Sequence, residues 1–208
     1  MLKLYYAPQT IAVATLISLE EAGAEYEPVR LDFRNAQQRT PEYLAVNPKG
    51  RVPALVTDRG ILTETPATLA YIAQTYPESK LAPFDDPFAL AQVQSFCAYL
   101  CSTVHVAHAH KMRGTRWVKE SDKAALKAMT ANVSKTMTEC FFLIENEMFQ
   151  GPWVMGSQFT ICDPYLFAIS SWLESDGVDV AQFPLVIEHR SRMHERDTVK
   201  RVMAMQKA

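Results

Sequence analysis

The sequence predicts an α/β domain over residues 1–76, a linker over residues 77–87 and an all-α domain over residues 88–208. Short β-type segments alternate with helical ones in the first part, whereas no strand pattern continues in the last part. The segment between them holds three prolines within eleven residues, a composition typical of a connection between domains. A length of 208 residues is sufficient for two small domains that share an interface.

The first domain is expected to begin with a β-strand, an α-helix and a second β-strand. Residues 2–6, "LKLYY", have strand composition, and residues 11–23 have helical length and end on Gly23, a residue that favours the end of a helix. Residues 25–33 alternate apolar and charged side chains with a period of two. This order predicts parallel strands joined by a right-handed crossover.

Further along, residues 35–50 are polar and then briefly helical. The segments "VPALVT" and "ILTE" flank Asp58-Arg59-Gly60, which predicts an antiparallel hairpin. A helix is expected over residues 65–77, with Pro66 in its first turn, where the missing N–H has no cost. This order of elements resembles that of a thioredoxin-like domain.

The second domain carries helical periodicity throughout, and its expected helices cover residues 88–112, 121–149, 160–174 and 184–206. The third of these begins at Thr160-Ile161-Cys162-Asp163, a Ser/Thr-x-x-acid pattern that caps a helix start. Asp163 is therefore interpreted as structural and not as a catalytic acid.

The composition excludes several classes of function. Hydrophobic residues make up 48% of the chain and charged residues 21%, and the net charge is −2, so no basic footprint for nucleic acid is present. The sequence has no signal peptide and no apolar run long enough to span a membrane, so a cytoplasmic protein without membrane contact is expected. The four cysteines, Cys97, Cys101, Cys140 and Cys162, have no zinc spacing and are expected to be reduced core residues.

The stretch "GRVPALV" at residues 50–56 contains a proline near the start of an apolar strand. Proline cannot donate to a β-ladder, so its position needs a reason. One reason is an ordinary trans proline at a strand start. The other is a cis bond between Val52 and Pro53, which turns the main-chain groups of Val52 outward. The thioredoxin-like order of elements favours the cis bond, because that fold has a cis-proline beside its ligand site.

Three motifs together resemble the cytosolic glutathione S-transferases of bacterial type: "NPKGRVPAL" at 47–55, "LTET" at 62–65 and "GSQFTICDPYL" at 156–166. Their order matches that family over nearly the whole chain. The resemblance implies a thioredoxin-like N-terminal domain, a helical C-terminal domain and glutathione as co-substrate.

Glutathione is an extended tripeptide with an anionic γ-glutamyl end, and the resemblance assigns its contacts. The main chain of Val52, next to Pro53, would pair with the cysteinyl backbone as an added strand does. The helix start at Thr65 would hold the γ-glutamyl carboxylate, and Glu64 would accept from the α-ammonium group. Family members usually have serine at the position of Thr65. Arg51, with Lys49 beside it, is a candidate for the glycyl carboxylate.

Two residues are candidates for holding the glutathione thiolate. Family members use tyrosine at the end of the first strand, where Tyr6 lies, or serine near the position of Thr10 at the start of the first helix. Ile11 stands where the beta class has its catalytic cysteine. Tyr6 is also interpretable as a core aromatic and Thr10 as a helix cap, so the choice between them stays open.

The segment "HVAHAHK" at residues 105–111 places His105 and His108 on one helix face and His110 away from it. No acidic residue at ligand spacing accompanies them, so no metal site is expected. In bacterial family members a histidine near His105 faces the active-site cleft, and the lysine that usually follows it is Val106 here. His105 and His108 are therefore candidates for the substrate cleft, with Trp117 nearby; the alternative for His105 is a surface or interdomain histidine.

The resemblance implies an enzyme that conjugates glutathione to small hydrophobic electrophiles in detoxification, acting as a homodimer. The alternative is a non-catalytic protein of the same fold that binds glutathione or a hydrophobic ligand. The missing serine or cysteine before the first helix slightly favours the alternative. The motifs around Val52 and Thr65 favour glutathione binding in both cases.

Overall fold

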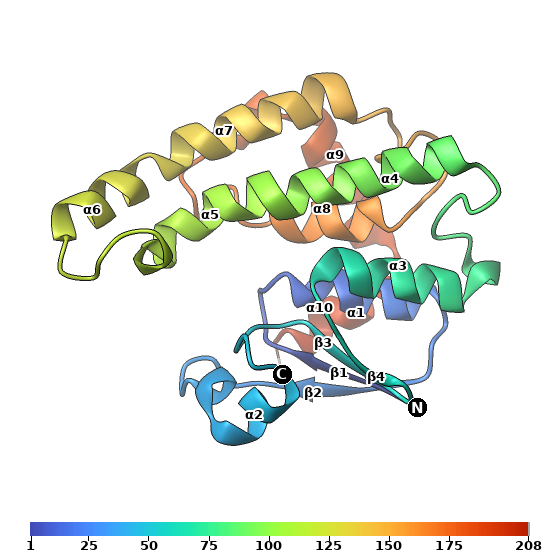
Figure 1. The fold of residues 1–208 in the computed structure, drawn as a ribbon. Helices are drawn as coiled ribbons and strands as arrows, with labels where there is room; N and C mark the ends of the chain where they lie inside the picture. The colour runs from blue at the N-terminus through green and yellow to red at the C-terminus, as the bar shows by residue number, and fades with distance from the viewer. Residues whose placement is uncertain (208) are drawn as a thin grey trace.

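A computed structural model describes residues 1–207 and contains a four-stranded sheet covered by helices (Figure 1). The strands are β1 (Leu2–Tyr6), β2 (Tyr26–Arg30), β3 (Ala54–Thr57) and β4 (Gly60–Thr63). Their spatial order is β2-β1-β3-β4, with β1 and β2 parallel and the other pairs antiparallel. This topology confirms the predicted strand–helix–strand unit and the predicted hairpin.

Three helices belong to the sheet half of the chain: α1 (Ala12–Glu21), α2 (Pro41–Val46) and α3 (Thr65–Thr75). Every residue of α1 from Ala12 to Leu19 is buried, because α3 packs on one side of it and α8 and α10 pack on the other. Gly23 follows this helix with φ of 63°, a conformation that glycine adopts without steric cost. The arrangement is the thioredoxin-like fold that the sequence predicts.

The remaining regular elements of the described chain are helices, joined by loops. They comprise α4 (Pro87–Tyr99), α5 (His105–Met112), α6 (Lys123–Ala131), α7 (Val133–Leu143), α8 (Cys162–Ser170), α9 (Pro184–Glu195) and α10 (Asp197–Met205). A π-helical turn over Leu100–Val104 joins α4 to α5 without a break, and a second one, Ile144–Met148, follows α7. None of the helices within residues 1–207 has the length and apolar character needed to cross a membrane.

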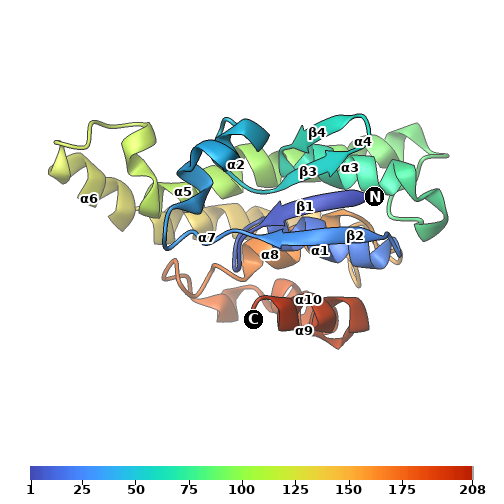
Figure 2. The ribbon, with the colours of Figure 1, turned by 90° about the horizontal axis from the view of Figure 1, so that it is seen from below.

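Three predicted elements differ from the structure. The helix predicted over residues 121–149 is divided at Asn132 into α6 and α7. The second strand ends at Arg30 and does not extend to Phe33, because the chain turns at Asp32, whose carboxylate accepts from the N–H groups of Arg34 and Asn35. The helix predicted over residues 184–206 is divided at Arg196, which is extended with ψ of 132°. Its second part, α10, turns back along α1 beyond the β2 edge of the sheet (Figure 2).

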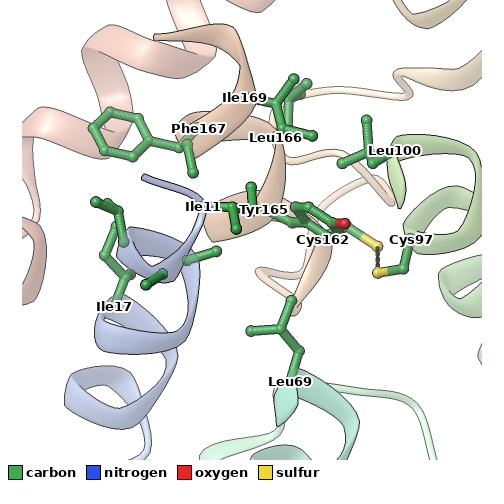
Figure 3. Packing of buried hydrophobic residues seen from close by; sticks show 14 of the residues in the cluster. Ile11, Ile17, Leu69, Cys97, Leu100, Cys162, Tyr165, Leu166, Phe167 and Ile169 are labelled. Carbon is green, nitrogen blue, oxygen red and sulfur yellow. Dashed lines mark hydrogen bonds between the residues drawn. The ribbon is translucent and has the colours of Figure 1, made fainter. Parts of the chain in front are cut away.

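The buried core continues from the sheet half into the helical half. Figure 3 shows Ile11 and Leu69 near Tyr165 of α8, and the sulfur atoms of Cys97 and Cys162 facing one another. These two cysteines are free thiols, and their sulfur atoms are 4.0 Å apart. Burial raises the pKa of the Cys162 thiol, so it stays neutral. The sheet half and the helical half therefore share one hydrophobic core. Close packing of this core fixes the position of the two halves relative to one another.

The start of α8 is held by Asp163, as the capping pattern predicts. Its carboxylate accepts from the N–H of Thr160 at 2.7 Å and from the N–H of Val154 at 2.8 Å, and His189 Nε2 lies 3.0 Å away. Asp163 is fully buried, so these partners replace the water that it loses.

Candidate functional site

A cleft of about 420 Å³ lies between the sheet half and the helical half of the chain. Residues near the ends of strands and the starts of helices form its first wall: Gln9, Thr10, Ile11, Arg39, Arg51, Val52, Pro53, Glu64 and Thr65. Residues of α5, α8, the π-helical turn before α5 and the segments that follow α5 and α8 form the second wall: Cys101, His105, His108, Met112, Arg113, Arg116, Trp117, Tyr165 and Trp172. The site residues predicted from the sequence line this cleft, except Tyr6 and Lys49.

Thr10 lies at the tight turn that leads into α1. Its hydroxyl donates to the carbonyl of Ala7 at 2.7 Å, and its oxygen lies 3.4 Å from the N–H of Ala12. The N–H groups of Thr10 and Ile11 have no hydrogen-bond partner among residues 1–207. A helix start with free N–H groups at the edge of a cleft favours a negative charge there.

Tyr6, at the end of β1, does not line the cleft. Its side chain is 5% exposed and belongs to the hydrophobic core. Leu4 and Tyr6 are both buried and share one face of β1, as the two-residue period of a strand requires. The phenol of Tyr6 is therefore placed as a core aromatic group, which is one of the two interpretations that the sequence allows.

The bond between Val52 and Pro53 is cis, as predicted, and Gly151–Pro152 is a second cis bond. No hydrogen bond within residues 1–207 uses the N–H or the C=O of Val52, which lines the cleft. The carbonyl of the preceding Arg51 is held from behind by the Tyr43 hydroxyl at 2.5 Å and by Asn47 Nδ2 at 2.7 Å. The main chain at Val52 is thus fixed and offers a donor and an acceptor for an added strand.

Glu64 and Thr65 form the start of α3 at the same wall. Glu64 has φ of 72°, an uncommon conformation for a residue with a side chain, which costs about 1–3 kcal/mol. The hydroxyl of Thr65 makes no hydrogen bond with the part of the chain described here. The Glu64 carboxylate pairs with Lys49 Nζ at 2.5 Å, so Lys49 braces Glu64 and does not itself line the cleft.

His105 and His108 face the cleft from α5, and both pack on Trp172. The ring of His108 stacks on Trp172 at 4.2 Å between centroids, and His105 lies 5.1 Å from it. Burial first, and then the charges of His108 and nearby arginines, lower the pKa of His105 from 6.5 to about 4. His105 is therefore neutral at pH 7.

His108 is fixed by an acidic partner that the sequence analysis missed. Its Nδ1 lies 2.6 Å from the Asp176 carboxylate, which is fully buried and also accepts from Lys111 Nζ at 3.2 Å. A carboxylate can only accept, so His108 carries its proton on Nδ1 and leaves Nε2 free. His110 points elsewhere and makes an edge contact with Trp117 at 4.5 Å.

Other lining residues also escaped the sequence analysis, among them Tyr165, Trp172 and the arginines Arg39, Arg113 and Arg116. The Tyr165 hydroxyl is buried and has no hydrogen-bond partner within residues 1–207. Burial, with the thiols of Cys101 and Cys97 nearby, raises its pKa, so it stays protonated as a donor. The described residues contain no group of three or more His, Cys, Asp or Glu side chains suited to a metal ion.

Comparisons with known proteins agree with this fold. The model of the glutathione S-transferase N-terminal domain matches residues 1–74. A crystal structure of a glutathione transferase homologue from Sulfitobacter, with bound glutathione, is 48% identical with a TM-score of 0.95 and covers 99% of this chain and 98% of that one. The chain therefore belongs to the glutathione S-transferase family.

More distant relatives extend over the same length. The glutathione S-transferase GstA of Escherichia coli O157:H7 is 27% identical over 201 residues, which are 96% of each chain. A beta class glutathione S-transferase from Sphingomonas chungbukensis is 29% identical with a TM-score of 0.84, and 98% of each chain is covered. The helical half is thus shared with these relatives as well as the sheet half.

Proposed function

We propose that this protein is a glutathione transferase that binds glutathione along the first wall of the cleft and transfers its thiolate to a small hydrophobic electrophile at the second wall. The observation that carries the proposal is the set of unused main-chain groups at Val52, Thr10 and Ile11 in one cleft. The glutathione-bound Sulfitobacter homologue supports the choice of ligand.

Each part of glutathione has a complementary group in this arrangement. The main chain of Val52 pairs with the cysteinyl residue, and the free N–H groups and hydroxyl at Thr65 receive the γ-glutamyl carboxylate. Glu64 accepts from the α-ammonium group, and its bond to Lys49 keeps its carboxylate in place. Arg51 is the cation nearest in sequence to Val52 and receives the glycyl carboxylate.

The thiolate then lies at the start of α1. The N–H groups of Thr10 and Ile11 and the field of the helix stabilise the negative sulfur, and the Thr10 hydroxyl becomes a further donor when it turns away from Ala7. Sulfur attacks the electrophilic carbon, and the leaving group departs with its electron pair. Catalysis consists of thiolate stabilisation and proximity of the two substrates.

The family resemblance also supports three finer expectations: a role in detoxification, a cytoplasmic location and a homodimer. Molecular mass in solution by light scattering tests the homodimer.

A non-catalytic glutathione-binding protein is the second candidate. Its support is specific: the Thr10 hydroxyl proton is already given to Ala7, and neither serine nor cysteine stands at this turn. In that case glutathione binds with its thiol protonated, and turnover is absent.

Calorimetric titration with glutathione tests the proposal. The double variant Glu64→Ala/Thr65→Ala is expected to bind at least about tenfold more weakly, a loss of about 1.4 kcal/mol, because it removes an acceptor and a donor for the γ-glutamyl end. The control variant Thr75→Ala/Glu78→Ala changes the same residue types at the other end of α3, outside the cleft, and is expected to bind normally. Equal affinity of both variants would show that the start of α3 does not bind glutathione. Turnover with chlorodinitrobenzene then separates the enzyme from the binding protein.

A further inference from the structure

Four arginines line the cleft, and none has an acidic partner among residues 1–207. Arg39 and Arg51 belong to the first wall, and Arg113 and Arg116 follow α5 in the second. Within residues 1–207, the guanidinium groups of these four residues form no ion pair and no hydrogen bond; the two hydrogen bonds to Arg51 use its main-chain carbonyl. The acidic side chain that lines the cleft, Glu64, already pairs with Lys49. The cleft therefore carries an excess of positive charge.

These charges are close enough to act on one another. Partial burial, followed by the positive charges of the other three arginines, lowers the pKa of Arg116. His105, which lines the same cleft, is neutral at pH 7 and compensates none of this charge. Uncompensated like charges around a concave site raise the local concentration of anions.

The turn that carries Arg113 and Arg116 is well packed. Its main chain is closed by hydrogen bonds from Arg116 N to Arg113 O and from Trp117 N to Gly114 O, both 2.9 Å long. A Cβ atom on Gly114 would lie 2.8 Å from a Leu126 methyl carbon and 3.1 Å from the Met129 sulfur, so α6 supports the turn closely from behind. The two guanidinium groups are thus presented from a fixed backbone.

Glutathione accounts for only part of the positive charge. It has two carboxylates and one ammonium group, and one carboxylate is received by the start of α3. The glycyl carboxylate needs one cation of the first wall, where Arg39 and Arg51 both lie. The thiolate lies at the start of α1. Arg113 and Arg116, on the opposite wall with Met112 and Trp117, are left for the second substrate.

Resting on the function proposed above, we infer that the electrophile is an anion: an apolar or aromatic molecule that carries a carboxylate. The planar guanidinium groups of Arg113 and Arg116 bind the carboxylate, and Met112 and Trp117 pack against the apolar part. In the transfer step the glutathione sulfur forms a bond to the electrophilic carbon, and the leaving group takes the electron pair of the bond that breaks. No oxidant or reductant is needed.

A matched pair of aryl chlorides tests this inference. The value of kcat/KM is measured for chlorodinitrobenzoate and for chlorodinitrobenzamide. Each value is divided by the rate constant of the uncatalysed reaction of the same chloride with glutathione, which removes the difference in intrinsic reactivity. The wild type is expected to favour the carboxylate by about tenfold or more. Arg113→Gln/Arg116→Gln is expected to lose this preference. The control Arg34→Gln/Arg59→Gln removes the same charge from residues outside the cleft and is expected to keep it.

Equal corrected rates for the two chlorides in the wild type, or an unchanged preference in Arg113→Gln/Arg116→Gln, would overturn the inference. A binding measurement separates this failure from failure of the proposed function. Dinitrobenzoate and dinitrobenzamide, which have no leaving group, are titrated into each variant by calorimetry without glutathione. If the wild type neither binds glutathione nor reacts with either chloride, the proposed function fails. Selective binding of dinitrobenzoate that depends on Arg113 and Arg116 still supports the anion site, and its absence overturns that site.

Discussion

Thr10 and Tyr6 are only four positions apart in the sequence, but Tyr6 is buried in the hydrophobic core, whereas Thr10 lines the cleft. Both are plausible thiolate donors from the sequence alone. Tyr6 shares the buried face of β1 with Leu4, whereas Thr10 reaches the cleft because the chain turns sharply at Gln9, whose φ is 58°. The alternation in "LKLYY" contained the signal that Tyr6 faces inward. The turn at Gln9 had no sequence signal, because glutamine seldom adopts a positive φ.

A pair of variants tests the role of Thr10. Thr10→Val removes the hydroxyl at nearly constant volume, and we expect the thiol pKa of bound glutathione to rise by about one unit, since a hydrogen bond to a charged group contributes about 1.5–3 kcal/mol. Tyr6→Phe is the matched control and is expected to leave this pKa unchanged. The thiolate absorbance of the complex, titrated with pH, measures both. A rise in the control alone would reverse the assignment.

His105 makes the stability of the protein depend on pH. Its pKa is lowered from 6.5 to about 4 in the folded state, so the unfolded chain binds a proton more readily between these values. Stability is therefore complete above pH 6.5 and falls as the pH decreases towards 4. The wild type is expected to lose about 2 kcal/mol of unfolding free energy through His105 between pH 7 and pH 5, and His105→Asn is expected to abolish this part of the loss. Urea unfolding at the two pH values measures it, and an unchanged difference in the variant would contradict the assignment.

Most elements followed from local patterns. The first two strands, the hairpin around Gly60 and the helix beginning near Pro66 all carry period or turn signals. The break between α9 and α10 carries none, because no glycine or proline stands near Arg196. The break is set by a distant partner, since the Arg196 guanidinium forms two hydrogen bonds of 2.6 Å with Glu21 at the end of α1. Tertiary contacts of this kind override helical periodicity.

Two aspartates that cap helices, one buried and one exposed, test how much burial adds to the contribution of a cap to stability. Asp163→Ala leaves the N–H groups of Thr160 and Val154 unpaired in the core and is expected to lower the free energy of unfolding by about 3–5 kcal/mol. Asp86→Ala removes an exposed cap of α4, which accepts from Phe88 and Ala89, and is expected to cost about 1 kcal/mol. Urea unfolding measures both. Similar losses of unfolding free energy in the two variants would show that the burial of Asp163 does not increase its contribution to stability.

At the scale of the whole molecule, the site depends on contacts across the two halves. Trp172 Nε1 donates to the carbonyl of Gln9 at 3.2 Å, and Gln206 accepts from the N–H of Gln9 at 3.0 Å. These partners come from α8, α10 and their ends, more than 160 positions away in the chain. Within the helical half, His108 and Asp176 also meet only on folding, since they are 68 positions apart in the chain. The glutathione-binding part of the first wall was predictable because its motifs are contiguous in the sequence. In the second wall only the segment around His105, His108 and Trp117 was predictable, because Tyr165 and Trp172 reach the cleft only through folding.

The salt bridge between the two halves is also testable. Glu21 is 8% exposed, and Glu21→Gln weakens its bonds to Arg196 and Thr198, so we expect a loss of about 1–3 kcal/mol in unfolding free energy. Glu27→Gln breaks the exposed pair with Lys3 and is expected to cost less than about 1 kcal/mol. Denaturant unfolding of the two variants gives the comparison. A larger loss in Glu27→Gln would contradict this account of how α10 is held against α1.

The most direct measurement is the pH titration of the wild-type complex with glutathione, followed by the ultraviolet absorbance of the thiolate. A free cysteine-type thiol has a pKa of about 8.5. If the start of α1 stabilises the sulfur as we propose, the bound thiol titrates at least about one unit lower, because one unit corresponds to about 1.4 kcal/mol of preference for the charged form. A bound thiol with the pKa of the free one would contradict the transferase mechanism and leave a protein that only binds glutathione.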